Sequence, residues 1–242
     1  MRRVGIGMVA LALIVNALLA ASVVPVAATA RRDVAWDLRP AIQQKLIPFP
    51  DLRKDQMAAY SKRHSGKRGW RLDEPVVIVQ HVTGGTSFED AWKTFAANER
   101  HLGEKPGVCV QFLIDTDGTI YQVADLGARC RHAIGLDDVA IGVEHVGRTA
   151  KSVLRNAAMM RSSLQLTLWL MASKRIEVRN VIGHAESLSS PYHHERYRDW
   201  ACLTGDDFGH RQMRTYRGLL RDHARANGVP VGPRPTWVEP RC

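Results

Sequence analysis

Two apolar segments that each end in a histidine constrain the fold of this chain more than any other feature. Residues 76–81 read VVIVQH and lie between a proline and two nearby glycines, and residues 178–184 read VRNVIGH. Apolar, β-branched runs bounded by Pro and Gly are typical of buried strands. Each histidine alone is explained by a hydrogen bond at the end of a strand. Together, on one edge of a sheet, His81 and His184 could hold a metal ion.

Helical and strand patterns alternate along the rest of the chain. Asp51 can cap a helix that ends near His64, and Ser87 can cap a second one. The Asp-Gly pair at residues 117–118 predicts a hairpin turn. The expected strands are 76–81, 108–114, 119–123, 139–146 and 178–184, and the later helices are 149–174 and 209–226, with a long loop at 185–205 between them. This order predicts an α/β fold with a mixed central β-sheet flanked by helices.

The first thirty residues have the features of a secretion signal. Arg2 and Arg3 precede an apolar run, and Ala-Thr-Ala at residues 28–30 fits a cleavage site. The apolar stretch is long enough to span a bilayer, so an uncleaved membrane anchor is the alternative. We expect an exported protein, either secreted or held in the periplasm or cell envelope, that contacts a membrane only through this segment.

Four cysteines, at positions 109, 130, 202 and 242, become disulfide candidates in an exported chain. The sequence alone leaves three pairings open. We favour a disulfide between Cys109 and Cys130, because these residues flank the predicted hairpin. The remaining pair, Cys202 and Cys242, would then tie down a proline-rich tail.

The formal net charge of +10 favours an anionic partner, such as nucleic acid, a membrane surface or an acidic cell-wall polymer. The basic residues are dispersed and no nucleic-acid-binding motif is present, so we do not expect nucleic acid. With 45% hydrophobic residues, the 242-residue chain can bury the core of one α/β domain or of two small ones. We expect a monomer.

A catalytic zinc site needs three protein ligands and one open position for water. His81 and His184 supply two of them, and the acids before the last helix, Asp206 and Asp207, supply candidates for the third. We prefer Asp207. Bound Zn²⁺ would lower the pKa of its water to about 7 and make hydroxide available at neutral pH. Glu144, near the end of another strand, is the candidate for proton transfer; its alternative role is an ion pair with an arginine.

Four segments occur in an order that resembles the type 2 N-acetylmuramoyl-L-alanine amidases, a family that includes the peptidoglycan recognition proteins. They are the strand that ends in His81, then FLIDTDGTIYQ at 112–122, IGVE at 141–144 and IGH at 182–184. The resemblance covers roughly residues 76–220. It implies a mixed sheet with surrounding helices, and hydrolysis of the amide between N-acetylmuramic acid and L-alanine in peptidoglycan or muropeptides.

Carried over to this chain, the resemblance implies zinc ligands at His81, His184 and Asp207 and a catalytic Glu144. His132, within an Arg-His-Ala sequence, resembles a segment that lines the family's substrate groove. The implied organisation is a signal peptide at 1–30, a lead-in and helix at 31–70, the zinc amidase domain at 71–228 and a tail at 229–242. Cys202 is a weaker alternative ligand, because some members bind zinc through cysteine.

Two positions depart from the pattern of many members of the family. Val110 stands where many have tyrosine, and Gly205 stands where many have a lysine or histidine that can stabilise the oxyanion. The candidates to replace that donor, and to contact substrate, are Arg131, His132, His193 and His194. Loss of one such donor typically costs about a hundred- to a thousand-fold in rate. A non-catalytic peptidoglycan-binding module of the same fold is therefore the alternative function.

Overall fold

The computed structural model describes residues 37–235 and residue 242, so the predicted secretion signal lies outside the described residues. Its strands are β1 (Gln43–Gln44), β2 (Val77–Val82), β3 (Phe112–Ile114), β4 (Ile120–Gln122), β5 (Ala140–His145) and β6 (Val181–Gly183). Its α-helices are α2 (Asp51–His64), α3 (Phe88–Ala97), α4 (Ala150–Arg155), α5 (Ala157–Lys174) and α6 (His210–Ala226). Three 3₁₀ segments complete the described elements: η1 (Val178–Asn180), η2 (His184–Ser189) and η3 (Arg198–Trp200).

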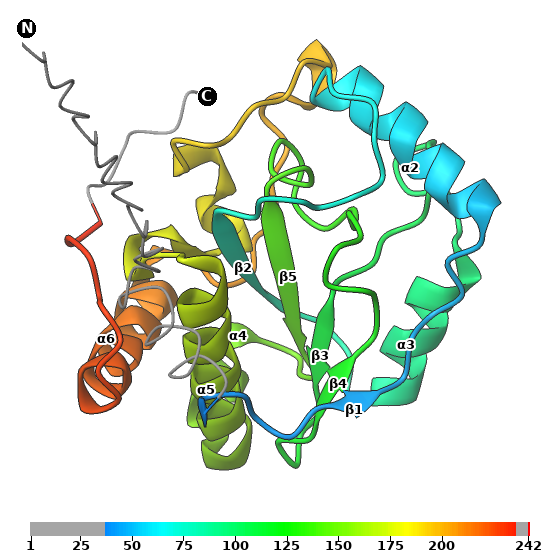
Figure 1. Cartoon of the computed structure of the whole chain (residues 1–242). Coiled ribbons are helices and arrows are strands. Elements are labelled where there is room, and N and C mark those ends of the chain that lie inside the picture. Colours follow the sequence, from blue (N-terminus) through cyan, green and yellow to red (C-terminus); the bar gives the residue numbers. More distant parts are fainter. Residues whose placement is uncertain (1–36, 236–241) are drawn as a thin grey trace, which may run out of the picture.

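The six strands form one sheet in the order β1-β4-β3-β5-β2-β6. β3 and β4 pair antiparallel as the predicted hairpin, and the other neighbouring strands pair parallel. Figure 1 shows α4, α5 and α6 on one side of the sheet and α2 and α3 on the other. The predicted α/β fold with a mixed central sheet is confirmed.

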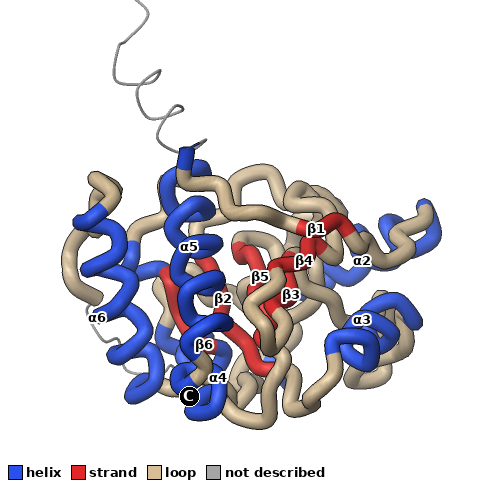
Figure 2. Tube along the Cα trace, turned by 90° about the horizontal axis from the view of Figure 1, so that it is seen from below, coloured by secondary structure: helices blue, strands red, loops and turns tan. Residues whose placement is uncertain are grey.

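Both faces of the central strands are buried, because helices or loops cover each face. Ile78 packs in the largest apolar cluster, with residues of α5 and α6, while Val77 and Val79 pack in a separate cluster with Leu136 and Ile182. Successive side chains of a strand point to opposite faces. This explains why β2 is apolar without alternation and why the first polar residues, Gln80 and His81, come at its carboxyl end. Figure 2 shows α5 lying across the sheet beside α6.

Both favoured disulfides are present in the structure. Cys109 is bonded to Cys130, and Cys202 is bonded to Cys242. The first joins the chain before β3 to the chain that follows β4, as expected of residues that flank a hairpin. The second ties the last residue of the chain to the loop before α6.

The second histidine strand is shorter than predicted. Residues 178–180 form η1, and strand pairing begins at Val181, opposite Ile78. Continued backwards, the same register would set residue 178 opposite Pro75, which has no N–H to donate. A strand that began at residue 178 would therefore lack one backbone donor from its neighbour at that end.

The predicted helix at 149–174 is two helices, because Asn156 interrupts it. The Asn156 side chain accepts hydrogen bonds from the amides of Ala158 and Met159 and so caps α5. Thr149 caps α4 in the same manner through the amide of Ser152. Asparagine competes with the helix for backbone hydrogen bonds, so its presence in the middle of the pattern was a usable signal.

The predicted helices at Asp51 and Ser87 are present. The Ser87 side chain accepts from the amide of Asp90 as predicted, whereas Asp51 lies in the first turn of α2, behind Pro50. The predicted loop at 185–205 contains η2 and η3, so it is not structureless. No helix among the described residues combines the length and apolar character that a bilayer crossing requires.

Helix α2 belongs to the body of the protein. Arg53 on this helix is 1% exposed, and its guanidinium donates to the carbonyl oxygens of Phe95 and Val108 at 2.8 Å and 3.2 Å. Tyr60, also on α2, is buried against Met57 and Trp200. The lead-in and the helix at 31–70 are therefore packed on the sheet-bearing part of the chain over their described residues.

Candidate metal centre

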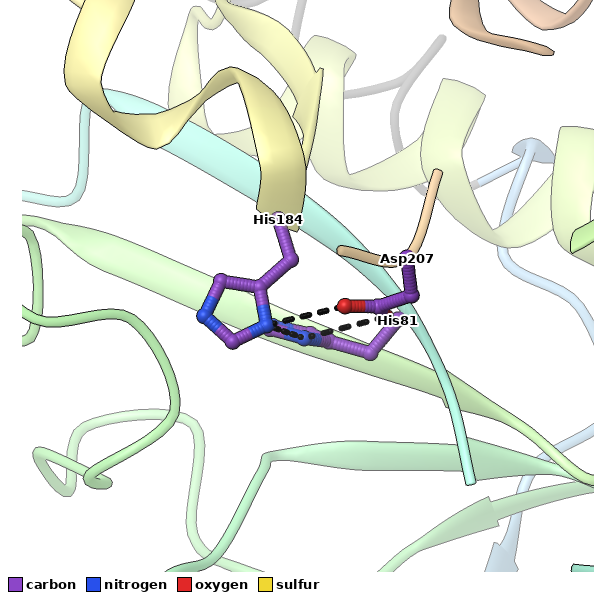
Figure 3. Close-up of side chains that lie close together, drawn as sticks. All are labelled: His81, His184 and Asp207. Carbon is purple, nitrogen blue, oxygen red and sulfur yellow. Dashed lines mark hydrogen bonds and ion pairs between the residues drawn. The ribbon is translucent and has the colours of Figure 1, made fainter. Parts of the chain in front are cut away.

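Three side chains from separate parts of the chain converge at the carboxyl edge of the sheet (Figure 3). One ligand atom from each of His81, His184 and Asp207 lies within 4.8 Å of the others. His184 Nδ1 is 3.0 Å from Asp207 Oδ1, and the Nδ1 atoms of the two histidines are 3.2 Å apart. His81 Nδ1 lies 3.7 Å from Asp207 Oδ2. The structure thus brings together the three residues that the sequence suggested as ligands.

Parallel pairing of β2 with β6 explains why the two histidines meet. Gln80 lies opposite Gly183, so the next residues, His81 and His184, reach the edge of the sheet at the same level. His184 is the first residue of η2, where the chain turns away from the sheet. Gly183 allows this turn beside the loop before α6, because a Cβ at that position would lie 1.7 Å from the carbonyl oxygen of Phe208.

Asp207 is fixed by contacts with the backbone of both histidine-bearing segments. The amide of Val82 donates to Asp207 Oδ2 at 2.8 Å, and the amide of Ala185 donates to the Asp207 carbonyl oxygen at 3.0 Å. These two backbone hydrogen bonds hold the carboxylate at the edge of the sheet. Asp206, the other acid considered, is exposed and does not belong to this group.

Gly205 provides the space that the His184 ring occupies. A Cβ at position 205 would lie 2.3 Å from His184 Nδ1, closer than any real Cβ contact. The His184 ring can take its observed position because this residue is glycine and not the larger residue found in many members of the family. A larger side chain, including the lysine or histidine expected from the resemblance, requires His184 to move.

A chain of hydrogen bonds through His132 determines which nitrogen of His81 carries a proton. The Ala140 carbonyl, 3.4 Å from His132 Nε2, can only accept, so Nε2 of His132 is the protonated nitrogen. Burial lowers the pKa of His132 to about 3, so the ring is neutral and its Nδ1 accepts from His81 Nε2 at 3.1 Å. His81 Nδ1 then presents a lone pair towards His184 and Asp207.

The electrostatic environment favours this neutral state of His81. Its pKa is held well below the usual value, mainly by burial and also by the neighbouring histidines. A neutral imidazole nitrogen is the form that binds a metal. Two imidazole nitrogens and a carboxylate, converging on one point, are a donor set that Zn²⁺ prefers, and three protein ligands leave a coordination position for water.

Glu144 lies on β5, directly opposite His81 on the neighbouring parallel strand β2. The side chain is largely buried, and burial raises the pKa of its carboxyl well above the usual value, with the charge of Asp207 adding to the effect. A carboxyl group with a raised pKa can both accept and return a proton near neutral pH.

These groups line a cavity of about 630 Å³. His132 and Arg131 also line it, but the Arg131 guanidinium donates to the carbonyl oxygens of Glu104 and Pro106 at 3.0 Å and 2.6 Å. His193 and His194 do not line this cavity; the His193 ring lies against Gly135, and the His194 amide donates to the Gly135 carbonyl oxygen. The structure therefore separates these two histidines from the other predicted substrate contacts.

Several contributions to this centre were not anticipated. The sequence gives no signal for the amide of Val82, for the room left by Gly205, or for the contact of His132 with His81. Tyr60 and Asp137 also line the cavity, and they are hydrogen-bonded to each other at 3.1 Å. These contacts arise from the arrangement of distant segments, so no local motif marks them.

The sequence profile of the family described as N-acetylmuramoyl-L-alanine amidase, Amidase_2, matches residues 71–199, just over half of the chain. This chain belongs to that family. His81, His132, Glu144 and His184 lie within the matched residues, and Asp207 lies beyond them. The predicted membership is confirmed. No curated protein matches the chain.

Solved structures of amidases are similar to this chain at low identity. The N-acetylmuramoyl-L-alanine amidase LysC from Clostridium intestinale URNW is 20% identical with a TM-score of 0.48, over 73% of this chain and 97% of that chain. A mutant endolysin from Bacillus subtilis is 21% identical with a TM-score of 0.45, over 75% and 99%. The E. coli amidase AmiD, in complex with anhydro-N-acetylmuramic acid-L-Ala-D-γ-Glu-L-Lys, is 19% identical with a TM-score of 0.38, over 46% and 49%.

Proposed function

We propose that this protein is an exported, zinc-dependent N-acetylmuramoyl-L-alanine amidase that hydrolyses the amide between N-acetylmuramic acid and L-alanine in peptidoglycan. The observation that carries the proposal is the convergence of His81 Nδ1, His184 Nδ1 and a carboxylate oxygen of Asp207 within 4.8 Å in a member of this family. The amidase domain would span residues 71–228, after the lead-in at 31–70 and before the tail at 229–242.

His81, His184 and Asp207 would hold the zinc ion. When bound, Zn²⁺ would lower the pKa of a water molecule and polarise the carbonyl of the substrate amide. His132 would act by orienting His81, since both of its ring nitrogens are engaged in the chain from Ala140 to His81. Partners of this kind typically change metal affinity by about ten- to a hundred-fold when they are removed.

Glu144 would move the proton. As a carboxylate it accepts a proton from the attacking water while the new C–O bond forms at the lactyl carbonyl. The same group then gives the proton to the L-alanine nitrogen as the C–N bond breaks. The products are a muramyl carboxylic acid and a peptide with a free amine. The raised pKa of Glu144 suits both steps, because it makes the carboxylate a better base and lets the acid persist near neutral pH.

The predicted export signal and the two disulfides support action outside the cytoplasm. Disulfides form and persist in oxidising compartments, and the described chain contains two. We propose that residues 1–30 are removed and that the mature protein acts on peptidoglycan in the cell envelope or medium. Mass spectrometry of the exported protein tests this: a chain that still begins at Met1 would contradict cleavage.

The decisive experiment measures release of L-alanine-terminated peptides from purified muropeptides, together with bound metal. We expect about one equivalent of zinc, loss of release after treatment with a chelator, and recovery when zinc is added back. Undiminished release from metal-free protein would contradict the zinc mechanism.

One variant and the unmodified protein together separate the amidase from the alternative of a binding module. Glu144→Gln should retain zinc and muropeptide binding and lose turnover. Val110 and Gly205 motivated the alternative, which predicts muropeptide binding without cleavage in the unmodified, zinc-loaded protein. That result would replace the amidase proposal.

A further inference from the structure

A second, larger cavity lies between α6 and the chain that follows it. Its volume is about 1010 Å³, and none of its lining residues lines the cavity of the metal centre. Two carboxylates, Glu186 and Asp222, line it. They are outnumbered by six arginines, which define what we call the arginine groove: Arg179, Arg214, Arg217, Arg221, Arg225 and Arg234.

The arginines come from three segments that pack together. Four of them recur on α6 at intervals of three, four and four residues, which places them along one face of the helix. From Arg214 to Arg225 this row extends roughly 16 Å at the rise of an α-helix. The chain that follows α6 turns back at Val229, whose amide donates to the Ala224 carbonyl oxygen, and runs beside that helix (Figure 1). Arg234 on this segment lines the same cavity.

Some of these charges are neutralised within the protein. Arg217 forms a two-bond ion pair with Glu186, at 2.6 Å and 2.9 Å. Arg225 pairs with Asp222 at 3.0 Å, and Arg179 pairs with Glu177 at 2.6 Å. Within residues 37–235 and residue 242, no carboxylate forms an ion pair with Arg214, Arg221 or Arg234. The groove therefore keeps a net positive charge.

Arg221 lies among other positive charges of the groove. The pKa of its guanidinium is lowered, first by burial and then by the positive charges of Arg217, Arg234 and Arg225, with Asp222 opposing them. Like charges this close repel each other, and an anion placed among them would relieve the repulsion.

We propose that the arginine groove binds a linear polymer that carries one phosphate group per repeat. Guanidinium groups donate in a planar fork that matches phosphate oxygens, and a phosphate offers oxygens to two arginines from different segments, such as Arg221 and Arg234. Arg214 and Arg221, the two arginines of this row without a carboxylate partner among the described residues, lie seven residues apart, or about 10 Å along α6, so a chain with regularly spaced charges can engage both of them. Tyr192, which lines the groove and is 40% exposed, offers a ring to the neutral part of a repeat.

The shape of the site favours a polymer strand over a membrane surface. The arginines line a concave groove, whereas a bilayer needs a flat or protruding face to reach its headgroups. The groove also adjoins η2, the segment that begins with His184 and includes Glu186. A bound polymer would hold the protein beside its substrate. This inference does not require amidase activity, because binding is measured without turnover.

The test compares two double variants of the full-length chain that remove the same charge. Arg214→Gln with Arg221→Gln removes two groove cations, and Arg155→Gln with Arg161→Gln removes two cations from exposed positions of α4 and α5 outside the groove. Glutamine is a good helix former, so all four positions should remain helical, which circular dichroism checks. Binding is measured by calorimetry with linear inorganic polyphosphate as the probe. We expect about ten-fold weaker binding for the groove pair and little change for the control pair.

Each other outcome overturns the proposal. Equal weakening by both pairs would indicate a general charge effect, and no polyphosphate binding by the parent protein would remove the site. Inorganic phosphate that competes as well as polyphosphate, at equal phosphate concentration, would indicate a site for a single anion. Equal or tighter binding of poly-γ-glutamate would indicate carboxylate recognition, and binding only to phosphatidylglycerol vesicles would indicate a membrane surface.

Discussion

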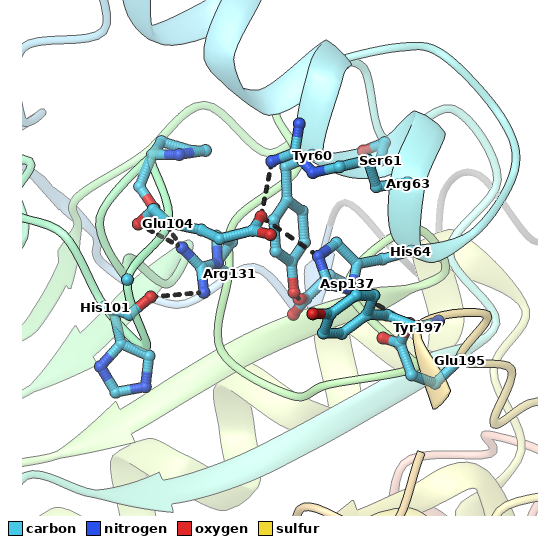
Figure 4. Close-up of polar contacts among 12 residues, drawn as sticks. Tyr60, Ser61, Arg63, His64, His101, Glu104, Arg131, Asp137, Glu195 and Tyr197 are labelled. Atoms are coloured by element: carbon cyan, nitrogen blue, oxygen red, sulfur yellow. Dashed lines mark hydrogen bonds and ion pairs between the residues drawn. The ribbon is translucent and has the colours of Figure 1, made fainter. Parts of the chain in front are cut away.

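Two of the clusters in the described chain that combine histidine with carboxylate differ in how their polar atoms are directed. One is the metal centre of His81, His184 and Asp207 (Figure 3). The other, which we call the His64 cluster, consists of His64, Glu104 and Glu195 (Figure 4). Both draw their members from segments that are far apart in the sequence, and in both the principal histidine is buried.

In the His64 cluster the carboxylates lie on opposite sides of the ring. Nδ1 is 3.0 Å from Glu195 Oε1, and Nε2 is 3.2 Å from Glu104 Oε2. The ring stacks on Tyr60 and Trp200, with centroid distances of 4.0 Å and 4.7 Å. Each ring nitrogen is thus engaged with a different acid, and the faces are covered. Such an arrangement connects α2 to two loops, but it cannot gather three donors on one ion.

In the metal centre the donors point to a common position instead. His132 engages the far nitrogen of His81, and the Nδ1 atoms of His81 and His184 both face Asp207. Residue types alone therefore do not distinguish a metal site from a structural cluster. The distinction lies in whether the lone pairs converge. Three experiments test it, and a fourth measures the cost of burying the carboxylate of Glu144 beside the metal centre.

Replacing a converging histidine should have the largest effect. His81→Ala or His184→Ala removes one of three proposed ligands, so we expect loss of bound zinc and a fall in amide hydrolysis on the order of a thousand-fold. Metal analysis and muropeptide release measure the two effects. His223→Ala, on α6, is the matched control and should retain both. Full zinc content in His81→Ala would exclude this centre.

Filling the space at Gly205 should have the next largest effect. In Gly205→Ala the new Cβ would displace the His184 ring, so we expect zinc affinity to fall by about ten- to a hundred-fold. Gly218→Ala is the control, because a Cβ at that helical position meets nothing within 4 Å and should stabilise α6 slightly. Competition with a coloured chelator measures the affinity. Unchanged affinity in Gly205→Ala would mean that the centre tolerates a shift of His184.

The His64 cluster should respond in stability rather than in metal content. His64→Ala leaves two carboxylates without their partner and a gap between two rings, so we expect the free energy of unfolding to fall by about 2 kcal/mol. Denaturant titration measures that loss, and the zinc content of the folded variant should stay unchanged. A matching loss of zinc would show that the two clusters are coupled.

The smallest expected change is one of stability: Glu144→Gln, beside its loss of turnover, should make the metal-free protein somewhat more stable. The folded state raises the pKa of Glu144, so its favourable contribution is complete below the unfolded pKa of 4.5 and is lost as the pH rises through the folded pKa. Glutamine stays neutral. We therefore expect the variant to be more stable at pH 7 by about 1 kcal/mol or more, with the difference disappearing below roughly pH 4.

Thermal unfolding across this pH range measures that difference. Glu74→Gln, which changes an exposed glutamate, is the control and should show no comparable pH-dependent gain. A Glu144→Gln variant that is less stable than the parent at pH 7 would contradict the inferred cost of burying the carboxylate.

Much of the fold follows from local pattern in the sequence. The apolar run of β2, the Asp-Gly turn between β3 and β4, and the Ser87 cap of α3 are each determined by residues close together in the chain. The predicted disulfide pairs followed from the position of that hairpin. Asn156 is also a local indication that the helix predicted at 149–174 is interrupted. The apolar residues that recur along this segment lead instead to the prediction of one continuous helix.

The sequence by itself determined which chemical groups stand at the ends of the strands: imidazole at His81 and His184, and carboxyl at Glu144. Tertiary structure decided their direction. The contact between the two histidine rings joins residues 103 apart, and the bond from Val82 to Asp207 joins residues 125 apart. Such distances depend on strand register and on the packing of loops at the edge of the sheet, and no local propensity encodes them. The lone pair of His81, the room beside Gly205 and the arginine groove are properties of the folded chain for the same reason.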